Sequence, residues 1–180
     1  HFLLTGHLIE LLKSTTGSRV VNVSSNAHKY GKMDWDNLLF ENGKDYTPIK
    51  SYGRSKLANL LFTYELQRRF ENQNVNSMAL ADHPGFSKTN LGRYLEKKIL
   101  LRLLMPVFNL MSQDQAQGAL PQICASVNPQ AKGGEYYGPD GKGERKGYPV
   151  LVQSNAASHN KEDAKKLWDL SEKITEIKYS

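Results

Sequence analysis

The feature that most constrains the fold is a short apolar run, a long helical pattern and a second short apolar run. Residues 19–25 are rich in β-branched side chains and end in two serines, which is typical of a buried strand in a parallel sheet. Residues 51–70 carry apolar side chains at helical spacing, and residues 75–81 form the second run. Strand, helix and strand in this order predict a βαβ unit with a right-handed crossover, and therefore an α/β protein.

The rest of the chain extends this pattern on both sides. Residues 26–51 are polar and contain Pro48, so they predict a long loop with one helical turn near residues 34–39. The glycine-rich stretch at 138–143 precedes charged residues, which favours a turn. With 180 residues and no internal repeat, we expect one domain over 1–180. Further helices are expected at 2–12, 91–111 (broken near Pro106), 114–127 and 161–177 (capped by Ser158 or Asn160), and a strand at 134–138.

Composition bears on the class of protein. The net charge of +6 comes from basic residues scattered in short clusters, which favours a solvated surface over nucleic-acid binding and leaves a phosphate-bearing small ligand compatible. The single cysteine, Cys124, excludes an internal disulfide and a cysteine-cluster metal site, and with no signal peptide it favours the cytoplasm. Residues 99–111 are too short and interrupted to span a bilayer, and the five histidines lack ligand spacing, so we expect no membrane span and no metal.

A tyrosine four residues before a lysine on a helix can form an acid/base pair, because the ammonium lies beside the phenol and makes it more acidic. This spacing occurs at Tyr46 and Lys50, at Tyr52 and Lys56, and at Tyr94 and Lys98. Pro48 disfavours a helix through the first pair, and the third lies in a charged stretch without a serine-ending strand before it. An isolated pair is more often a surface tyrosine on a lysine stem. Tyr52 and Lys56, however, begin the long helix, and Ser25 ends the preceding strand.

Three ordered segments closely resemble the short-chain dehydrogenase/reductases. They are residues 21–27 (VNVSSNA), residues 52–59 (YGRSKLAN) and residues 83–85 (HPG) with Thr89. The wide gap between Ser25 and Tyr52 is most similar to the retinol-dehydrogenase-like branch. The resemblance implies a Rossmann-like, doubly wound parallel sheet, of which this chain would be the C-terminal half with the catalytic serine, tyrosine and lysine.

The resemblance also assigns roles by position. Tyr52 would be the general acid/base, Lys56 would make its phenol more acidic and bond the nicotinamide ribose, and Ser25 would hold the substrate oxygen. The implied cofactor is NAD or NADP, and the implied substrate is a hydrophobic carbonyl or alcohol, with residues 99–111 forming either a lid over it or core. The remaining residues expected at the cofactor are Ser24, Pro84 and Gly85 in the turn under the nicotinamide, and the Ser87 backbone and Thr89 hydroxyl at its carboxamide.

The chain departs from the family's pattern at three points. Asp82 places an acid near the site, and a turn residue at the strand end is the simpler interpretation. Ser87 stands where the family has a branched aliphatic residue. The family's glycine-rich strand–turn–helix for the pyrophosphate and its catalytic asparagine are not in this sequence, which opens at His1 without Met inside a helical pattern; we therefore expect a preceding half.

The leading hypothesis is an NAD(P)-dependent oxidoreductase, with homo-oligomerisation left open. A non-catalytic fragment acting as a scaffold or interaction module is the alternative. A sugar-nucleotide epimerase shares the tyrosine and lysine, but the tail after Gly143 is too short for its substrate domain. A serine–lysine hydrolase built on Ser25 and Lys56 would need an oxyanion hole and a nucleophile on a tight turn, and the sequence shows neither.

Overall fold

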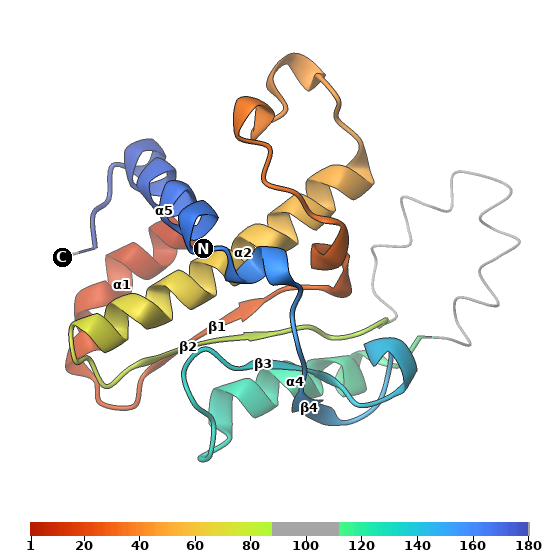
Figure 1. Ribbon diagram of the computed structural model, residues 1–180. Coiled ribbons are helices and arrows are strands. Elements are labelled where there is room, and N and C mark those ends of the chain that lie inside the picture. Colours follow the sequence, from red (N-terminus) through yellow and green to blue (C-terminus); the bar gives the residue numbers. More distant parts are fainter. Residues whose placement is uncertain (88–111, 180) are drawn as a thin grey trace, which may run out of the picture.

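A computed structural model describes residues 1–87 and 112–179 and contains a four-stranded, mostly parallel sheet (Figure 1). The strand order is β1-β2-β3-β4, with the first three strands parallel and β4 antiparallel to β3. The strands are β1 (Arg19–Val23), β2 (Met78–Asp82), β3 (Tyr136–Pro139) and β4 (Pro149–Leu151).

Helices cover both faces of this sheet, as a doubly wound arrangement requires. In Figure 1, α1, α2 and α5 lie on one face, and α4 lies on the other. Their bounds are α1 (Phe2–Ser14), α2 (Pro48–Asn72), α4 (Gln115–Val127) and α5 (Lys161–Thr175). The α/β class predicted from the βαβ pattern is confirmed, and so is the Rossmann-like sheet that the family resemblance implies.

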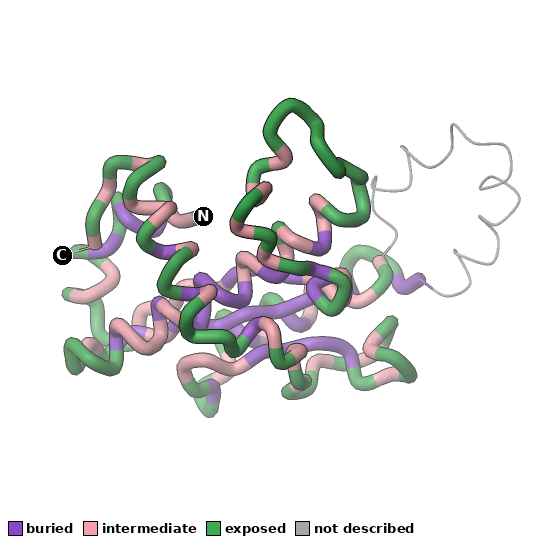
Figure 2. Tube along the Cα trace, turned by 45° about the horizontal axis from the view of Figure 1, so that its top comes forward, coloured by how far each residue is buried: buried purple, intermediate pink, exposed green. Residues whose placement is uncertain are grey.

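Buried apolar clusters lie on both faces of the sheet. On the α2 face, Phe62, Phe70 and Trp168 pack together, with the ring of Phe2 meeting Trp168 edge-on at 5.0 Å between centroids. On the α4 face, Leu80 packs against Ala125 and its neighbours. Figure 2 shows the buried stretch running along the strands and α2, while the loop after β1 is mostly exposed.

Several boundaries differ from the sequence-based expectations. Helix α2 begins at Pro48 instead of residue 51, because Thr47 caps it by accepting a hydrogen bond from Lys50 N and proline is tolerated in the first turn. The loop before it holds three short 3-10 helices, η1 (Asn26–Tyr30), η2 (Trp35–Asn37) and η3 (Glu41–Gly43), where one turn was predicted.

The C-terminal part contains one strand that the sequence did not reveal. Strand β4 is only three residues long and pairs with β3 across a turn that holds Gly141 and Gly143. The turn predicted over 138–143 is confirmed for these two glycines, whereas Gly138 lies in β3. Asn160 is the cap of α5, with its side-chain oxygen accepting from the backbone N–H groups of Glu162 and Asp163. The helices expected over 91–111 lie outside the described residues.

Candidate active site

The first turns of α2 lie against the carboxyl end of β1. Ser24 Oγ donates to the Lys56 carbonyl at 2.8 Å, and Lys56 Nζ donates to the Val23 carbonyl at 3.2 Å. The same Lys56 Nζ lies 5.6 Å from the centroid of the Tyr52 ring. The predicted pair therefore shares one helix face, and its ammonium is anchored at the edge of the sheet where ligands bind in open α/β folds.

Ser25 lies directly after this strand end and caps η1. Its Oγ accepts from Ala27 N at 3.2 Å, and its carbonyl accepts from His28 N at 2.9 Å. The η1 segment packs closely on α2, since a Cβ at Gly53 would meet the Ala27 carbonyl at 2.9 Å. Gly53, next to Tyr52, thus lets the segment that follows Ser25 lie against the start of α2.

Ser24 has a different environment from the one expected of a cofactor ligand. It is buried, and its hydroxyl is engaged by the Lys56 carbonyl. Asn59, one turn beyond Lys56, donates through Nδ2 to the same Val23 carbonyl at 2.9 Å. Ser24 and Asn59 therefore hold α2 against the strand end and fix where the Lys56 side chain starts.

The turn after β2 is held by contacts to its backbone. Gly85 has φ +65, and a Cβ there would clash with the Arg145 carbonyl, so the position requires glycine. Phe86 N donates to that carbonyl at 2.7 Å, and Gln113 Nε2 donates to the Pro84 carbonyl at 2.8 Å. Ser87 forms a parallel bridge with Gln113. Thr89, expected beside the nicotinamide carboxamide, lies outside the described residues.

Asp82 ends β2 as a buried residue, whereas a turn residue was expected. It is 1% exposed, and its Oδ1 has no hydrogen-bond partner among the described residues. Burial raises the pKa of this carboxyl to about 7, and the charge of Lys56 partly opposes the rise. Burial likewise lowers the pKa of Lys56, and Asp82 partly opposes that shift.

Two buried histidines beside the site had no role in the sequence interpretation. His28 Nδ1 lies 2.7 Å from the Ser25 carbonyl, and Asn155 N donates to His28 Nε2, so the ring is neutral with its proton on Nδ1. His83 Nδ1 accepts from Gly85 N at 3.2 Å, and its Nε2 lies 3.1 Å from Glu144 Oε2. Burial lowers the pKa of both imidazoles. Only the His-Pro-Gly motif hinted at His83.

These groups suit the nicotinamide end of a dinucleotide. Lys56 uses one of its three N–H groups on Val23 and so has donors for ribose hydroxyls. The Tyr52 phenol and the Ser25 hydroxyl can both bond a carbonyl or alcohol oxygen. The glycine-dependent turn at Gly85 lets the backbone come close to a flat ring.

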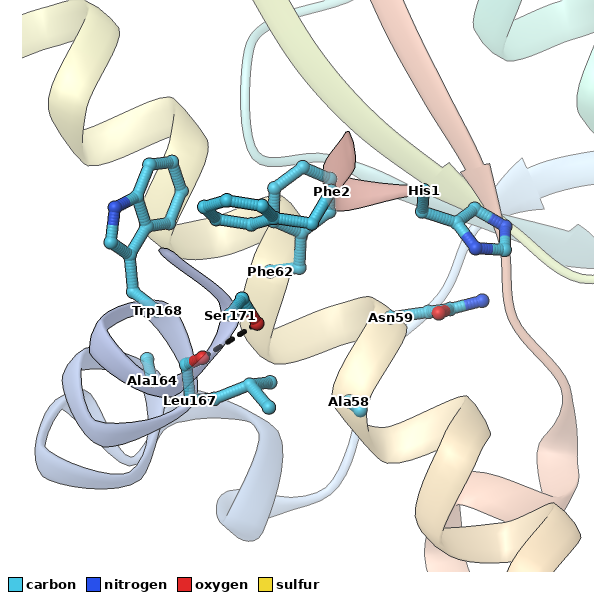
Figure 3. A pocket seen from close by; sticks show the side chains of 9 residues that line it. All are labelled: His1, Phe2, Ala58, Asn59, Phe62, Ala164, Leu167, Trp168 and Ser171. Carbon is cyan, nitrogen blue, oxygen red and sulfur yellow. Dashed lines mark hydrogen bonds between the residues drawn. The ribbon is translucent and has the colours of Figure 1, made fainter. Parts of the chain in front are cut away.

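The hollows in the described part of the chain include the following two. One, of about 200 Å³, lies between α1, α2 and α5, with Phe2, Phe62 and Trp168 at one end and His1 and Asn59 at the other (Figure 3). The second, of about 500 Å³, lies between the loop after η1 and the start of α2. Tyr52 lines neither hollow. Within 1–87 and 112–179, no helix is long and apolar enough to cross a membrane, and no three potential metal-ligating side chains gather.

Comparison with known proteins gives a consistent result. No family model matches the chain. Human retinol dehydrogenase 14 is 42% identical over 178 residues, covering 96% of this chain and 48% of that protein. Retinol dehydrogenase 12 of Mus musculus is 35% identical over 181 residues, covering 99% and 52%. The crystal structure of an uncharacterised protein from Mycobacterium paratuberculosis matches with a TM-score of 0.76 and 32% identity, covering 100% of this chain and 57% of that one.

The chain thus spans about half the length of the curated relatives that it matches. The part of this chain that matches them includes the carboxyl end of β1, the Tyr52 and Lys56 pair and the turn at Gly85. Sequence identity over nearly the whole chain and a shared fold lead to one conclusion. The chain belongs to the short-chain dehydrogenase/reductase family, in the branch that contains the retinol dehydrogenases.

Proposed function

We propose that this chain carries the catalytic half of an NAD(P)-dependent oxidoreductase that acts on a hydrophobic carbonyl or alcohol. The observation that carries the proposal is the Lys56 ammonium, anchored on the Val23 carbonyl and 5.6 Å from the Tyr52 ring centroid at the carboxyl edge of a parallel sheet. The relatives support it, because they are named for dehydrogenating retinol, an apolar alcohol. The choice between NAD and NADP stays open.

In this proposal the three residues divide proton transfer, charge stabilisation and positioning of the substrate among them. Tyr52 donates its phenolic proton to the substrate oxygen during reduction and takes it back during oxidation. The positive charge of Lys56 stabilises the phenolate that remains, and Ser25 Oγ hydrogen-bonds the substrate oxygen. When bound, the nicotinamide supplies or accepts the hydride.

The remaining residues hold the cofactor or its surroundings. One of the two remaining N–H groups of Lys56 binds the ribose, and the turn of Pro84, Gly85 and Ser87 supports the nicotinamide. Ser24 acts through the Lys56 backbone. We also propose the cytoplasm as the compartment, since a single cysteine suits a reducing environment.

The test is Tyr52→Phe in the protein that contains this chain, assayed with NADPH or NADH and a hydrophobic aldehyde. The rate should fall about 10²- to 10⁴-fold, because a positioned acid contributes that much. Tyr46→Phe is the matched control, since Tyr46 stands at the same spacing from Lys50 but precedes the capped start of α2. A Tyr52→Phe protein that keeps the wild-type rate would overturn the assignment.

The alternative is a non-catalytic scaffold or interaction module. Titrating the protein that contains this chain with NADPH and with NADH separates the two proposals. A change in nicotinamide fluorescence supports the catalytic role, and an unchanged signal with both dinucleotides supports the scaffold.

A further inference from the structure

Asp82 is a buried carboxyl group that the proposed reaction does not use. It lies at the end of β2, opposite Val23 in the parallel register, and its backbone carbonyl accepts from Ser24 N at 2.6 Å. Val23 is the residue whose carbonyl accepts the Lys56 ammonium. The carboxyl group and the ammonium are therefore attached to the same pair of strand ends.

The elements around Asp82 offer it one cation among the described residues. From α2, Lys56 acts electrostatically on Asp82. From β3 come Tyr136, which senses the Asp82 charge, and Tyr137, which pairs with Asp82 in register. Helix α4 has no charged side chain and only the Cys124 thiol to titrate, while the neighbouring His83 lies against Glu144.

We propose that Asp82 is a positioning residue for Lys56, and that its carboxylate holds the ammonium in place and offsets part of the positive charge that Lys56 presents to Tyr52. This deepens the proposed function and rests on it where activity is concerned. The buried Oδ1 has no hydrogen-bond partner among the described residues, and Lys56, which has two N–H groups beyond the one on Val23, is the cation that acts on this carboxyl. A buried carboxylate in this place without a cation would be strongly unfavourable.

The first experiment measures stability and needs no activity. The folded-state pKa of Asp82, about 7, is above that of the unfolded chain, so the folded state holds an extra proton between about pH 4 and pH 7. Stability from this group is present at low pH and is lost as pH rises towards 7. Asp82→Asn removes this loss while keeping the size of the side chain. His28 and His83 titrate in both proteins and cancel in the difference.

The quantity to compare is the difference in melting temperature between Asp82→Asn and wild type at each pH. We expect this difference to increase by about 3 °C or more from pH 5 to pH 8. Asp36→Asn, a change at an exposed acid, is the matched control and should give a flat difference. In Lys56→Met the wild-type Asp82 should titrate at higher pH, because its cation is gone. This arm also serves if Asp82→Asn fails to fold. A flat difference for Asp82→Asn, or a Lys56→Met protein that titrates as wild type does, would overturn the proposal.

The second experiment measures alcohol oxidation against pH. Oxidation needs the phenolate of Tyr52. The positive charge of Lys56 stabilises this phenolate, and the negative charge of the Asp82 carboxylate weakens that stabilisation. In Asp82→Asn, the rising limb of kcat/KM should therefore move to lower pH by roughly one unit, and Asp36→Asn should leave it in place. An unmoved limb contradicts the proposal. If wild type has no activity, the proposed function fails, while the stability arm still decides whether Asp82 and Lys56 are coupled.

Discussion

The two halves of α2 differ in what their side chains do. Residues 48–59 direct Lys56 and Asn59 to the carbonyl of Val23, the residue that pairs in register with the buried Asp82. Residues 60–72 put fully buried apolar side chains into the core, among them Leu60 and Phe70. One continuous helix thus joins a region that stabilises the fold to a region that places reactive groups. A rigid helix anchored at one end keeps the other end in register, even where polar groups there are costly to bury.

The largest effect should come from the apolar half. Phe70→Ala removes a side chain that is 1% exposed, and we expect the free energy of unfolding to fall by about 3–5 kcal/mol, measured by denaturant unfolding. Ile49→Ala in the first turn is the matched control, because Ile49 is 67% exposed and should change the value by no more than about 0.5 kcal/mol. Equal losses from both variants would erase the distinction between the halves.

A smaller effect is expected at Arg54, which ties the loop to the first half of α2. Its guanidinium donates to the carbonyls of Lys32, Asn37 and Leu38 and lies 4.0 Å from the Phe40 ring centroid. Arg54→Ala should cost about 1–3 kcal/mol and speed proteolytic cleavage within residues 32–40. Arg54→Lys keeps the charge but lacks the planar fork, so it should restore little. Cleavage at the wild-type rate in Arg54→Ala would show that the loop holds its position without this clamp.

The buried histidines predict that the stability of the fold depends on pH. Since burial lowers the pKa of His83 below that of the unfolded chain, the unfolded state binds more protons, and stability falls as pH drops below about 6.5. Asp82 acts in the opposite sense, so melting temperatures are best compared in the Asp82→Asn background. There, His83→Asn should reduce the loss between pH 7 and pH 5, whereas the exposed His7→Asn should not. The reverse ranking would contradict the prediction.

The smallest effect should be at the caps. Thr47 accepts one exposed hydrogen bond of 3.3 Å at the start of α2, so Thr47→Ala should cost about 0.5 kcal/mol. Asn160 accepts two bonds of 3.0 and 3.1 Å at the start of α5, so Asn160→Ala should cost about 1 kcal/mol. Thermal unfolding of both variants measures the ranking, and a larger loss at Thr47 would mean that the first turn of α2 contributes more than its contacts indicate.

Local patterns in the sequence predicted the parts of the structure that depend on near neighbours. The facing of Tyr52 and Lys56 follows from i and i+4 spacing on one helix, and the β1-α2-β2 unit follows from periodicity. Strand β4 could not be predicted in this way, because three residues are too few to show an alternating pattern and the strand forms only by pairing with β3. The burial of Asp82 depends on α2 and α4 closing over the sheet, so a strand-end acid was naturally interpreted as a turn residue. The assignment of 1–180 to one domain stays a prediction.

The parallel register between Val23 and Asp82 also bears on the order in which the molecule is assembled. These residues are roughly 60 positions apart, so a long loop must close, with a loss of chain entropy, before their pairing contributes any stabilisation. Such contacts form slowly. The α2 helix and the β3–β4 hairpin need only local contacts and can form first. The strand end that binds the Lys56 ammonium would then be among the last features to form. Slow-folding or destabilised variants should lose this binding before they lose their helices.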